Sequence, residues 1–192
     1  VSVWMVAEAI RRLRIVYKKP IVYTNRVQRL FLTAALLTAI VLVITYLSVP
    51  ELILSIGAGM LALPVVMLIA NFVNKPLEAS ITRWYYNDAK RKLSAMPDLK
   101  IIGVTGSFGK TSTKHYLYRI LSEKYNVLMT PGNFNTTLGV IRTVREQLKP
   151  HHQIFIVEMG AKQVGDIKEI CDLVHPTIGI VTAVGEMHLE TF

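Results

Sequence analysis

Two long uncharged runs constrain the fold of this chain more than any other feature. Residues 30–50 read LFLTAALLTAIVLVITYLSVP and residues 52–74 read LILSIGAGMLALPVVMLIANFVN, and only Glu51 separates them. A membrane-spanning helix needs about 20 consecutive apolar residues, and both runs reach that length. The intervening SVPE, residues 48–51, has the composition of a tight turn. We therefore predict a transmembrane helical hairpin over residues 30–74.

The charges beside the two runs predict how this hairpin is oriented. Residues 1–30 carry seven Lys and Arg against one acid, and residues 75–100 carry six against three. The positive-inside rule assigns both flanks to the cytoplasm and the tip, which holds Glu51 and no cation, to the outside. Two buried core helices are the alternative, but the rest of the chain is too small to cover them. A cleaved signal peptide is disfavoured because the apolar stretch is too long and starts too late.

The segments flanking the hairpin are predicted to lie near the membrane. Residues 1–29 are a basic juxtamembrane segment. In residues 75–99, Pro76 suits the first turn of a helix and Pro97 ends it. The apolar residues at helical spacing in this connector are Leu77, Ile81, Trp84, Tyr85 and Leu93. We expect either an amphipathic connector helix at the membrane surface or a helix packed on the domain that follows.

Residues 100–192 change to alternating short strands and helices. The predicted strands are 100–105, 126–130, 154–159 and 177–184, and the predicted helices are 110–124, 138–148 and 163–174. In the first helix, Leu117, Ile120 and Leu121 are expected to face inward. Repeated β-α units of this kind predict an α/β fold, a parallel sheet covered by helices on both faces.

The turn after the first strand has the features of a phosphate-binding loop. Its glycines let backbone N–H groups face phosphates, and the helix that follows adds a positive dipole. Lys110 can reach the β- and γ-phosphates of a nucleotide, and the Thr111 hydroxyl can bind Mg²⁺. The generic G-x-x-x-x-G-K-[ST] spacing fails, because Val104 stands where its first glycine is expected. The residues predicted to bind the nucleotide are Thr105, Gly106, Ser107, Phe108, Gly109, Lys110, Thr111 and Ser112.

Three later stretches carry polar side chains toward the same site. Asn133 and Asn135 lie in the turn after the second strand, at an edge where ligands bind in open parallel sheets. Glu158 ends an apolar strand and is predicted to be the second Mg²⁺ anchor beside Thr111. His188 follows the fourth strand and is a candidate metal ligand in that setting.

The net charge of +9 does not predict a nucleic-acid partner. Residues 101–192 carry nine cations against eight acids, whereas a nucleic-acid binder carries its basic face on the folded domain. We therefore expect no nucleic acid, and we assign the basic excess to contacts with membrane lipids. Cys171 is the single cysteine, which excludes an intrachain disulfide and a cysteine zinc cluster within this chain.

Four ordered motifs resemble the central ATPase domain of the Mur ligases. They are GVTGSFGKTSTK, PGNFNTTLGV, VEMGAKQVGDIKEI and TAVGEMHLETF, in this order, and the match spans roughly residues 100–192. Within the family they are most similar to the ligases that add D-alanyl-D-alanine. The offset glycines, Gly103 and Gly106, match the Mur variant of the phosphate loop, which accounts for the failure of the generic spacing.

The resemblance implies a reaction and a role for each matched residue. Mur ligases use ATP to phosphorylate a substrate carboxylate, and an amine then attacks the acyl phosphate to give an amide, ADP and phosphate. By this resemblance Lys110 would hold the phosphates, and Thr111 and Glu158 would bind one Mg²⁺. His188 would bind a second Mg²⁺, so the catalytic set is Lys110, Glu158 and His188. The residues that would contact substrate and the transferring phosphoryl group are Asn133, Asn135 and Thr136.

The resemblance also implies what differs in this chain. Soluble Mur ligases begin with a uridine-diphosphate-binding domain, where this chain has the hairpin and the connector. The family's amine-binding domain would lie beyond Phe192, so we expect an incomplete chain that is inactive alone.

The prediction is a bacterial inner-membrane ligase with a cytoplasmic catalytic domain, using ATP and Mg²⁺. It would join a UDP-muramoyl peptide, or a lipid-linked equivalent, to an amino acid or D-Ala-D-Ala. The alternatives are a membrane-bound polyglutamate-type synthetase and a membrane-anchored P-loop regulator of polysaccharide assembly.

Overall fold

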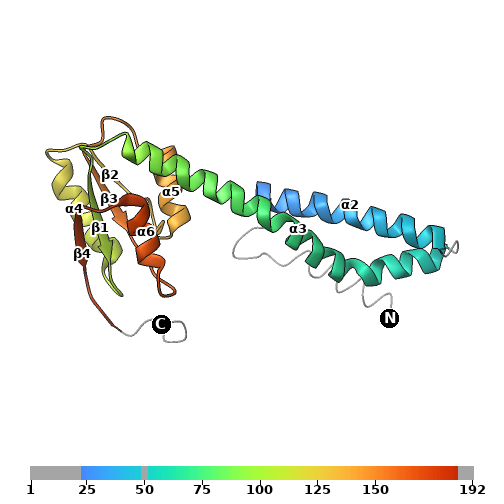
Figure 1. Ribbon diagram of the computed structural model, residues 1–192. Coiled ribbons are helices and arrows are strands. Elements are labelled where there is room, and N and C mark those ends of the chain that lie inside the picture. The colour runs from blue at the N-terminus through green and yellow to red at the C-terminus, as the bar shows by residue number, and fades with distance from the viewer. Residues whose placement is uncertain (1–22, 49–51, 186–192) are drawn as a thin grey trace. The chain divides into compact units, whose positions relative to one another are not determined.

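The computed structural model describes residues 23–48 and 52–185 (Figure 1). The chain divides into two compact units, and the boundary between Ala79 and Ser80 falls inside one long helix. The predictions for the basic segment before residue 23, for the turn at 49–51 and for His188 lie outside the described residues.

An antiparallel pair of helices forms the first unit. It consists of α2 (Asn25–Ser48) and the first part of α3 (Leu52–Ser94). At one end of the pair, Arg29 donates from Nε and Nη2 to Glu78 Oε1 at 2.9 and 2.7 Å. This two-bond contact fixes the register in which the two helices face each other.

The two helices bury small residues and expose large apolar ones. Ala34 and Ala70 are buried, and Gly59 lies so close to Leu42 that a β-carbon there would contact its side chain. Large apolar residues such as Leu36 and most others along both helices are exposed, the reverse of the pattern in a water-soluble core. By length and composition alone, both helices could cross a membrane.

The second apolar run and the predicted connector are one continuous helix. The sequence predicts Pro76 in the first turn of a separate helix, but α3 runs through both Pro64 and Pro76. A proline inside a helix removes one N–H bond and bends the axis, and a long helix with good neighbouring turns tolerates that loss. The helix ends at Ser94, just before Pro97.

The second unit contains a parallel four-stranded sheet (Figure 1). Its strands are β1 (Lys100–Thr105), β2 (Val127–Met129), β3 (Ile154–Glu158) and β4 (Ile178–Val181). Their order in the sheet is β2-β3-β1-β4, and every neighbouring pair is parallel. The predicted parallel α/β sheet is confirmed, with each strand inside its predicted range.

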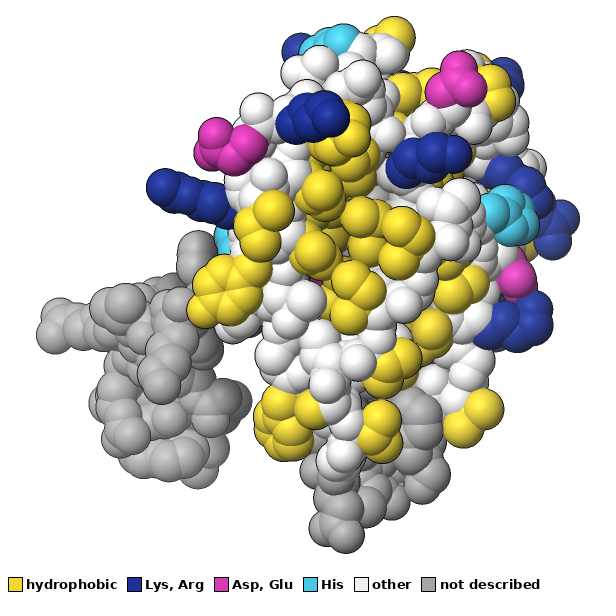
Figure 2. All heavy atoms as spheres, turned by 90° about the vertical axis from the view of Figure 1, so that its left-hand side faces the viewer, with side chains coloured by type: hydrophobic (Ala, Val, Ile, Leu, Met, Phe, Trp, Pro, Cys, Tyr) yellow, Lys and Arg dark blue, Asp and Glu magenta, His cyan; other side chains and the backbone are white. Residues whose placement is uncertain are grey.

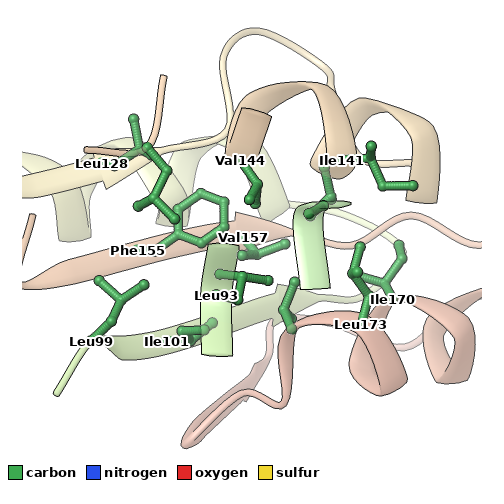
Figure 3. Packing of buried hydrophobic residues seen from close by; sticks show 14 of the residues in the cluster. Leu93, Leu99, Ile101, Leu128, Ile141, Val144, Phe155, Val157, Ile170 and Leu173 are labelled. Carbon is green, nitrogen blue, oxygen red and sulfur yellow. The ribbon is translucent and has the colours of Figure 1, made fainter. Parts of the chain in front are cut away.

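Helices cover both faces of this sheet. They are α4 (Lys110–Ser122) on one face, and α5 (Thr137–Glu146), α6 (Asp166–Val174) and the last turns of α3 on the other. Side chains along β3 alternate between the faces. Phe155 and Val157 pack with α5, α6 and α3 (Figure 3), whereas Ile154 and Ile156 pack with α4.

Helix α4 meets the sheet through a narrower stripe than predicted. Leu117 and Leu121, four residues apart, pack on the sheet, but Ile120 is 69% exposed. Ile120 lies about 100° around the helix from Leu121, which carries it off the buried stripe. Ile178 and Val181 of the edge strand β4 are also exposed, and hydrophobic side chains gather on this side of the molecule (Figure 2).

The last turns of α3 are bound to α5 within the second unit. The Arg145 guanidinium lies 4.1 Å from the centre of the Tyr85 ring, and its Nε donates to Asp88 Oδ2 at 2.8 Å. Ala89 and Leu93 are buried in the same core as α5. This part of the connector therefore packs on the domain, which was one of the two predicted arrangements.

Candidate active site

The phosphate loop joins β1 to α4 and exposes the start of that helix. Gly109 caps α4 in the left-handed conformation, with φ at +81°, so the first N–H groups of the helix are open to a ligand. Lys110 Nζ donates to the carbonyl oxygens of Gly106 and, at 3.2 Å, of Ser107. The ammonium group thus lies over the loop that would hold the phosphates. Thr111 and Ser112 are exposed on the first turn, and Phe108 is exposed at the tip.

The segment after β4 holds the loop in shape. Ser107 N–H donates to Ala183 O at 2.6 Å, and the Ser107 hydroxyl donates to Gly185 O at 2.9 Å. The Thr182 hydroxyl donates to the carbonyls of Thr105 and Phe108. A loop held on both sides in this way is preorganised for an anion.

Gly106 allows the loop to lie this close to its neighbours. Its φ is +134°, and a β-carbon there would lie 2.8 Å from Ala183 O and closer still to Thr182 Oγ1. We expect Gly106→Ala to lower nucleotide affinity at least about tenfold, because backbone strain of about 1–3 kcal/mol adds to the clash. Calorimetric titration with ADP measures this.

Gly165→Ala is the matched control for that variant. Gly165 also has a positive φ, at +101°, but a β-carbon there meets nothing within 4 Å. It should destabilise the fold slightly and leave ADP affinity unchanged. Equal loss of ADP affinity in both variants would contradict a specific role for Gly106.

Glu158 lies at the centre of a buried polar cluster at the end of β3. Thr111 Oγ1 lies 3.2 and 3.1 Å from its two carboxylate oxygens, and Asn135 Nδ2 lies 3.4 Å from Oε1. Lys114 Nζ lies 2.9 Å from Oε2, and both side chains of this ion pair are almost completely buried. The Glu158 N–H donates to Thr130 Oγ1 at 3.1 Å. Three side chains thus contact the carboxylate, and one of them is Thr111 of the phosphate loop.

A cavity of about 1070 Å³ opens beside the phosphate loop within the second unit. Lys110 and the loop form one wall, and Asn135 and Thr136 at the start of α5 form another. Thr82 and Tyr86 of α3 close a third side. These walls meet at the carboxyl ends of β1 and β3, where parallel sheets bind their ligands.

An acidic edge faces this cavity from the start of α6. Asp166 accepts the backbone N–H groups of Lys162 and Gln163 at 2.8 and 3.1 Å. These bonds lower the pKa of Asp166. The ionised Asp166 carboxylate therefore stabilises the fold at pH values above the ordinary carboxyl pKa. The effect is lost only as the pH falls through the lowered value. The edge therefore stays negative at neutral pH.

The family comparison agrees with this geometry. The model of the Mur ligase middle domain matches residues 104–192, from the end of β1 onward. Residues 104–192 are therefore similar to a Mur ligase middle domain. The predicted resemblance is confirmed over this segment, and the offset phosphate loop is part of it.

Relatives and a solved structure extend the Mur ligase match. A UDP-N-acetylmuramoyl-tripeptide–D-alanyl-D-alanine ligase of Synechocystis is 45% identical over 91 residues, 47% of this chain and 20% of the relative. The corresponding ligase of Bacillus subtilis is 37% identical over 91 residues, with the same coverage. A MurF ligase of Thermotoga maritima in complex with ADP is 36% identical with a TM-score of 0.53, covering 56% of this chain and 25% of that one. The chain thus spans about a fifth of the length of these curated relatives.

The structure brings most of the predicted Mur ligase site residues together. Lys110, Asn135 and Thr136 line the cavity, and Thr111 contacts Glu158. Asn133 is different, because its side chain is exposed in the turn and does not line the cavity. Among residues 23–48 and 52–185, no three His, Cys, Asp or Glu side chains cluster as a metal site. The Thr111 hydroxyl, 3.1 Å from the Glu158 carboxylate, is a described oxygen that could bind a metal together with it.

Three residues of this site were not among those predicted from the sequence. Lys114 pairs with Glu158, Thr130 accepts its N–H, and Thr182 donates to the loop. A signal existed only for Lys114, which follows Lys110 by four residues and so lies on the same face of α4. The two threonines carry no such pattern.

Proposed function

We propose that this chain is part of a membrane-anchored ATP-dependent amide ligase of peptidoglycan precursor synthesis. The observation that carries the proposal is the contact between Thr111 and Glu158 beside Lys110, inside a Mur ligase middle domain. The matched relatives are named as ligases for D-alanyl-D-alanine, and a solved relative contains ADP. These relatives favour the ligase hypothesis over a polyglutamate-type synthetase or a P-loop regulator.

The residues present fit a Mg²⁺ ion beside the nucleotide. Magnesium prefers hard oxygen ligands and usually shares them with substrate phosphates. The Thr111 hydroxyl and Glu158 carboxylate, 3.1 Å apart, are such a donor pair at the start of α4. When bound, the ion would neutralise charge on the phosphates during transfer. His188 is proposed to bind a second ion, on the family resemblance alone.

The chain's own residues would mainly hold and orient the reactants. Phosphoryl transfer needs positioning and charge neutralisation more than covalent help from the protein. Lys110 would leave its loop carbonyls to hold the β- and γ-phosphates against the N–H groups of α4. Asn135, fixed by Glu158, would orient the carboxylate that attacks the γ-phosphorus.

Two balanced steps complete the proposed reaction. A carboxylate oxygen of the substrate bonds to the γ-phosphorus, and the bond to the leaving ADP oxygen breaks. The free amine of the second substrate then attacks the acyl carbon, phosphate leaves with its bonding electron pair, and the amine loses a proton. The products are an amide, ADP and inorganic phosphate. The substrates proposed from the relatives' names are UDP-muramoyl-tripeptide, or a lipid-linked equivalent, and D-Ala-D-Ala.

The membrane anchor is proposed from the helical pair of the first unit. Residues 30–48 as a helix extend about 28 Å, close to the ~30 Å hydrocarbon core of a bilayer. The Arg29–Glu78 ion pair sits where this apolar length begins, at the level expected for lipid headgroups. The large apolar side chains that both helices expose would face lipid. The basic flanks favour a cytoplasmic location for the catalytic unit, at the bacterial inner membrane.

Cysteine labelling in intact cells tests this topology. In a Cys171→Ser background, Ser48→Cys is expected to react with a membrane-impermeant maleimide from outside, because it ends α2 near the hairpin tip. Ser122→Cys, at the end of α4, should react only after the cells are permeabilised.

The Cys171→Ser replacement removes the single native thiol of residues 1–192, so within this chain only the introduced cysteine can react. Labelling of both introduced cysteines only after permeabilisation would contradict the membrane hairpin. Labelling of Ser122→Cys from outside would contradict the orientation.

Nucleotide binding tests the proposed function at its first step. The protein that carries this chain, purified in detergent, should bind ADP in the presence of Mg²⁺, as measured by calorimetric titration. Its ATP turnover should need a carboxylate substrate of the UDP-muramoyl-peptide class. An ATP turnover rate that is the same with and without such substrates would support a P-loop regulator instead.

A further inference from the structure

Lys114 is a buried charge that the proposed reaction does not use directly. Its side chain is completely buried on the sheet side of α4. Its Nζ lies 2.9 Å from Glu158 Oε2 and donates to the carbonyl of Gly132 at 2.6 Å. One ammonium group therefore ties three segments together, which are α4, the end of β3 and the turn after β2. Burying a lysine is costly unless it is paired and hydrogen-bonded, and this one is both.

The contacts of Glu158 divide its two oxygens between different partners. Oε2 faces Lys114, whereas Oε1 faces Asn135 and both oxygens lie near the Thr111 hydroxyl. With Lys114 on one side, the other side of the carboxylate is directed toward the phosphate loop. A cation that approaches from the loop would meet Oε1 and the Thr111 hydroxyl together.

The charges of this cluster do not favour a free cation. In the part of the chain that the structure describes, this cluster contains the ammonium groups of Lys110 and Lys114 and the carboxylate of Glu158. A carboxylate already paired with a buried ammonium attracts a divalent ion weakly, because the lysine charge repels the ion across a short, poorly screened distance. The phosphates of a nucleotide would reverse this balance, since they bring several negative charges to the same loop.

We infer that Lys114 is a positioning residue that balances the charge of Glu158, so that the divalent ion enters the site only together with a nucleotide. The inference rests on the proposed nucleotide-dependent function. Because of Lys114, the nucleotide or its metal complex would bind first. The free metal ion would not bind to the site before the nucleotide. The contact of Lys114 with the Gly132 carbonyl would also hold in place the turn that leads to Asn135.

Manganese binding measured by electron paramagnetic resonance tests the inference without any turnover. Free Mn²⁺ is titrated into the detergent-purified protein that carries this chain, with and without saturating ADP. The wild type should bind Mn²⁺ at least tenfold more tightly with ADP than without it. Lys114→Met, which keeps the length of the side chain and removes the charge, should bind Mn²⁺ without ADP at least tenfold more tightly than the wild type.

Two further variants separate charge from packing. Lys114→Arg keeps the charge and should retain the dependence on ADP. Lys124→Met removes an exposed lysine just after α4 and should behave as the wild type. A merely structural role for Lys114 predicts weaker metal binding in Lys114→Met, so a gain in affinity is diagnostic. Thermal unfolding checks that each variant is folded.

Each outcome bears on the inference, even if Lys114→Met does not fold. Wild-type protein that binds Mn²⁺ equally tightly with and without ADP would overturn it. An unchanged nucleotide-free affinity in a folded Lys114→Met would also overturn it. ADP binding is followed separately by calorimetry in EDTA and in Mg²⁺. Failure to bind ADP in both would reject the proposed function, whereas ADP binding with tight nucleotide-free Mn²⁺ binding would reject this inference alone.

Discussion

Lys110→Ala is expected to lower ATP turnover by about 1,000-fold or more, because the Lys110 ammonium group lies against the carbonyl oxygens of the phosphate loop. The lysine ammonium is the group that can neutralise charge on the transferring phosphoryl oxygens without rearrangement of the backbone. Phosphate release by the detergent-purified protein that carries this chain measures the effect. The same variant should still enter the membrane, since the helical pair forms a separate compact unit.

Lys124→Ala is the control for the loss of a lysine. Lys124 is exposed just after α4, and its removal should leave turnover within about twofold of the wild type. Turnover that survives in Lys110→Ala would mean that this loop does not hold the nucleotide. Loss of membrane insertion in that variant would contradict the independence of the two units.

Glu158→Gln is expected to reduce Mg²⁺-dependent turnover by about 100-fold or more, while ADP still binds in the absence of metal. The amide keeps the shape of the side chain but loses the charge that the ion needs. It also leaves the buried Lys114 without its partner charge, which costs about 3–5 kcal/mol of folding stability. Initial rates over a range of Mg²⁺ concentrations, together with thermal unfolding, separate these two effects.

Glu123→Gln provides the matched control for this substitution. Glu123 follows α4 and is exposed, so the same change there should alter neither the turnover nor the unfolding temperature. An unaltered Mg²⁺ dependence in a folded Glu158→Gln protein would remove Glu158 from the metal site. The phosphate loop would then need another partner for the ion.

Periodic features of the sequence predicted most of the fold. Strand alternation such as Ile154 against Phe155 follows directly from the pleat, so the parallel sheet and its two covered faces could be predicted. Helix ends could be predicted only to within a few residues, because capping depends on local backbone geometry. Ile120 was assigned to the core because periodicity alone does not reveal how wide a face the sheet covers.

The course of α3 could not be predicted, because two effects compete at Pro76. A proline favours the start of a helix, but apolar and helix-favouring residues on both sides favour continuation. The structure resolves this in favour of one helix from Leu52 to Ser94. Contacts made far along the chain, such as Tyr85 and Asp88 with Arg145, then fix its last turns. No local pattern carries that information.

The site divides in the same way between local and long-range features. Lys110 and Thr111 could be predicted because glycines and a helix start surround them in the sequence. Glu158 could be predicted from its place at a strand end. Thr130 could not be predicted, and the spacing of Lys114 from Lys110 indicates only its face of α4, because the partners of both residues are set when α4, β2 and β3 pack together. The role of Asn133 stays a prediction: its side chain is exposed, whereas Asn135, two residues later, reaches the cluster.

Product formation by the complete protein distinguishes a D-Ala-D-Ala ligase from the alternatives. The complete protein that carries this chain, in detergent or reconstituted membranes, is given ATP, Mg²⁺, UDP-muramoyl-tripeptide and D-Ala-D-Ala. Phosphate release and the mass of the UDP-linked product are followed together. The proposed function predicts one phosphate released for each substrate that gains the dipeptide through a new amide bond. ATP turnover without any adduct, repeated across amino acids and dipeptides, would contradict it.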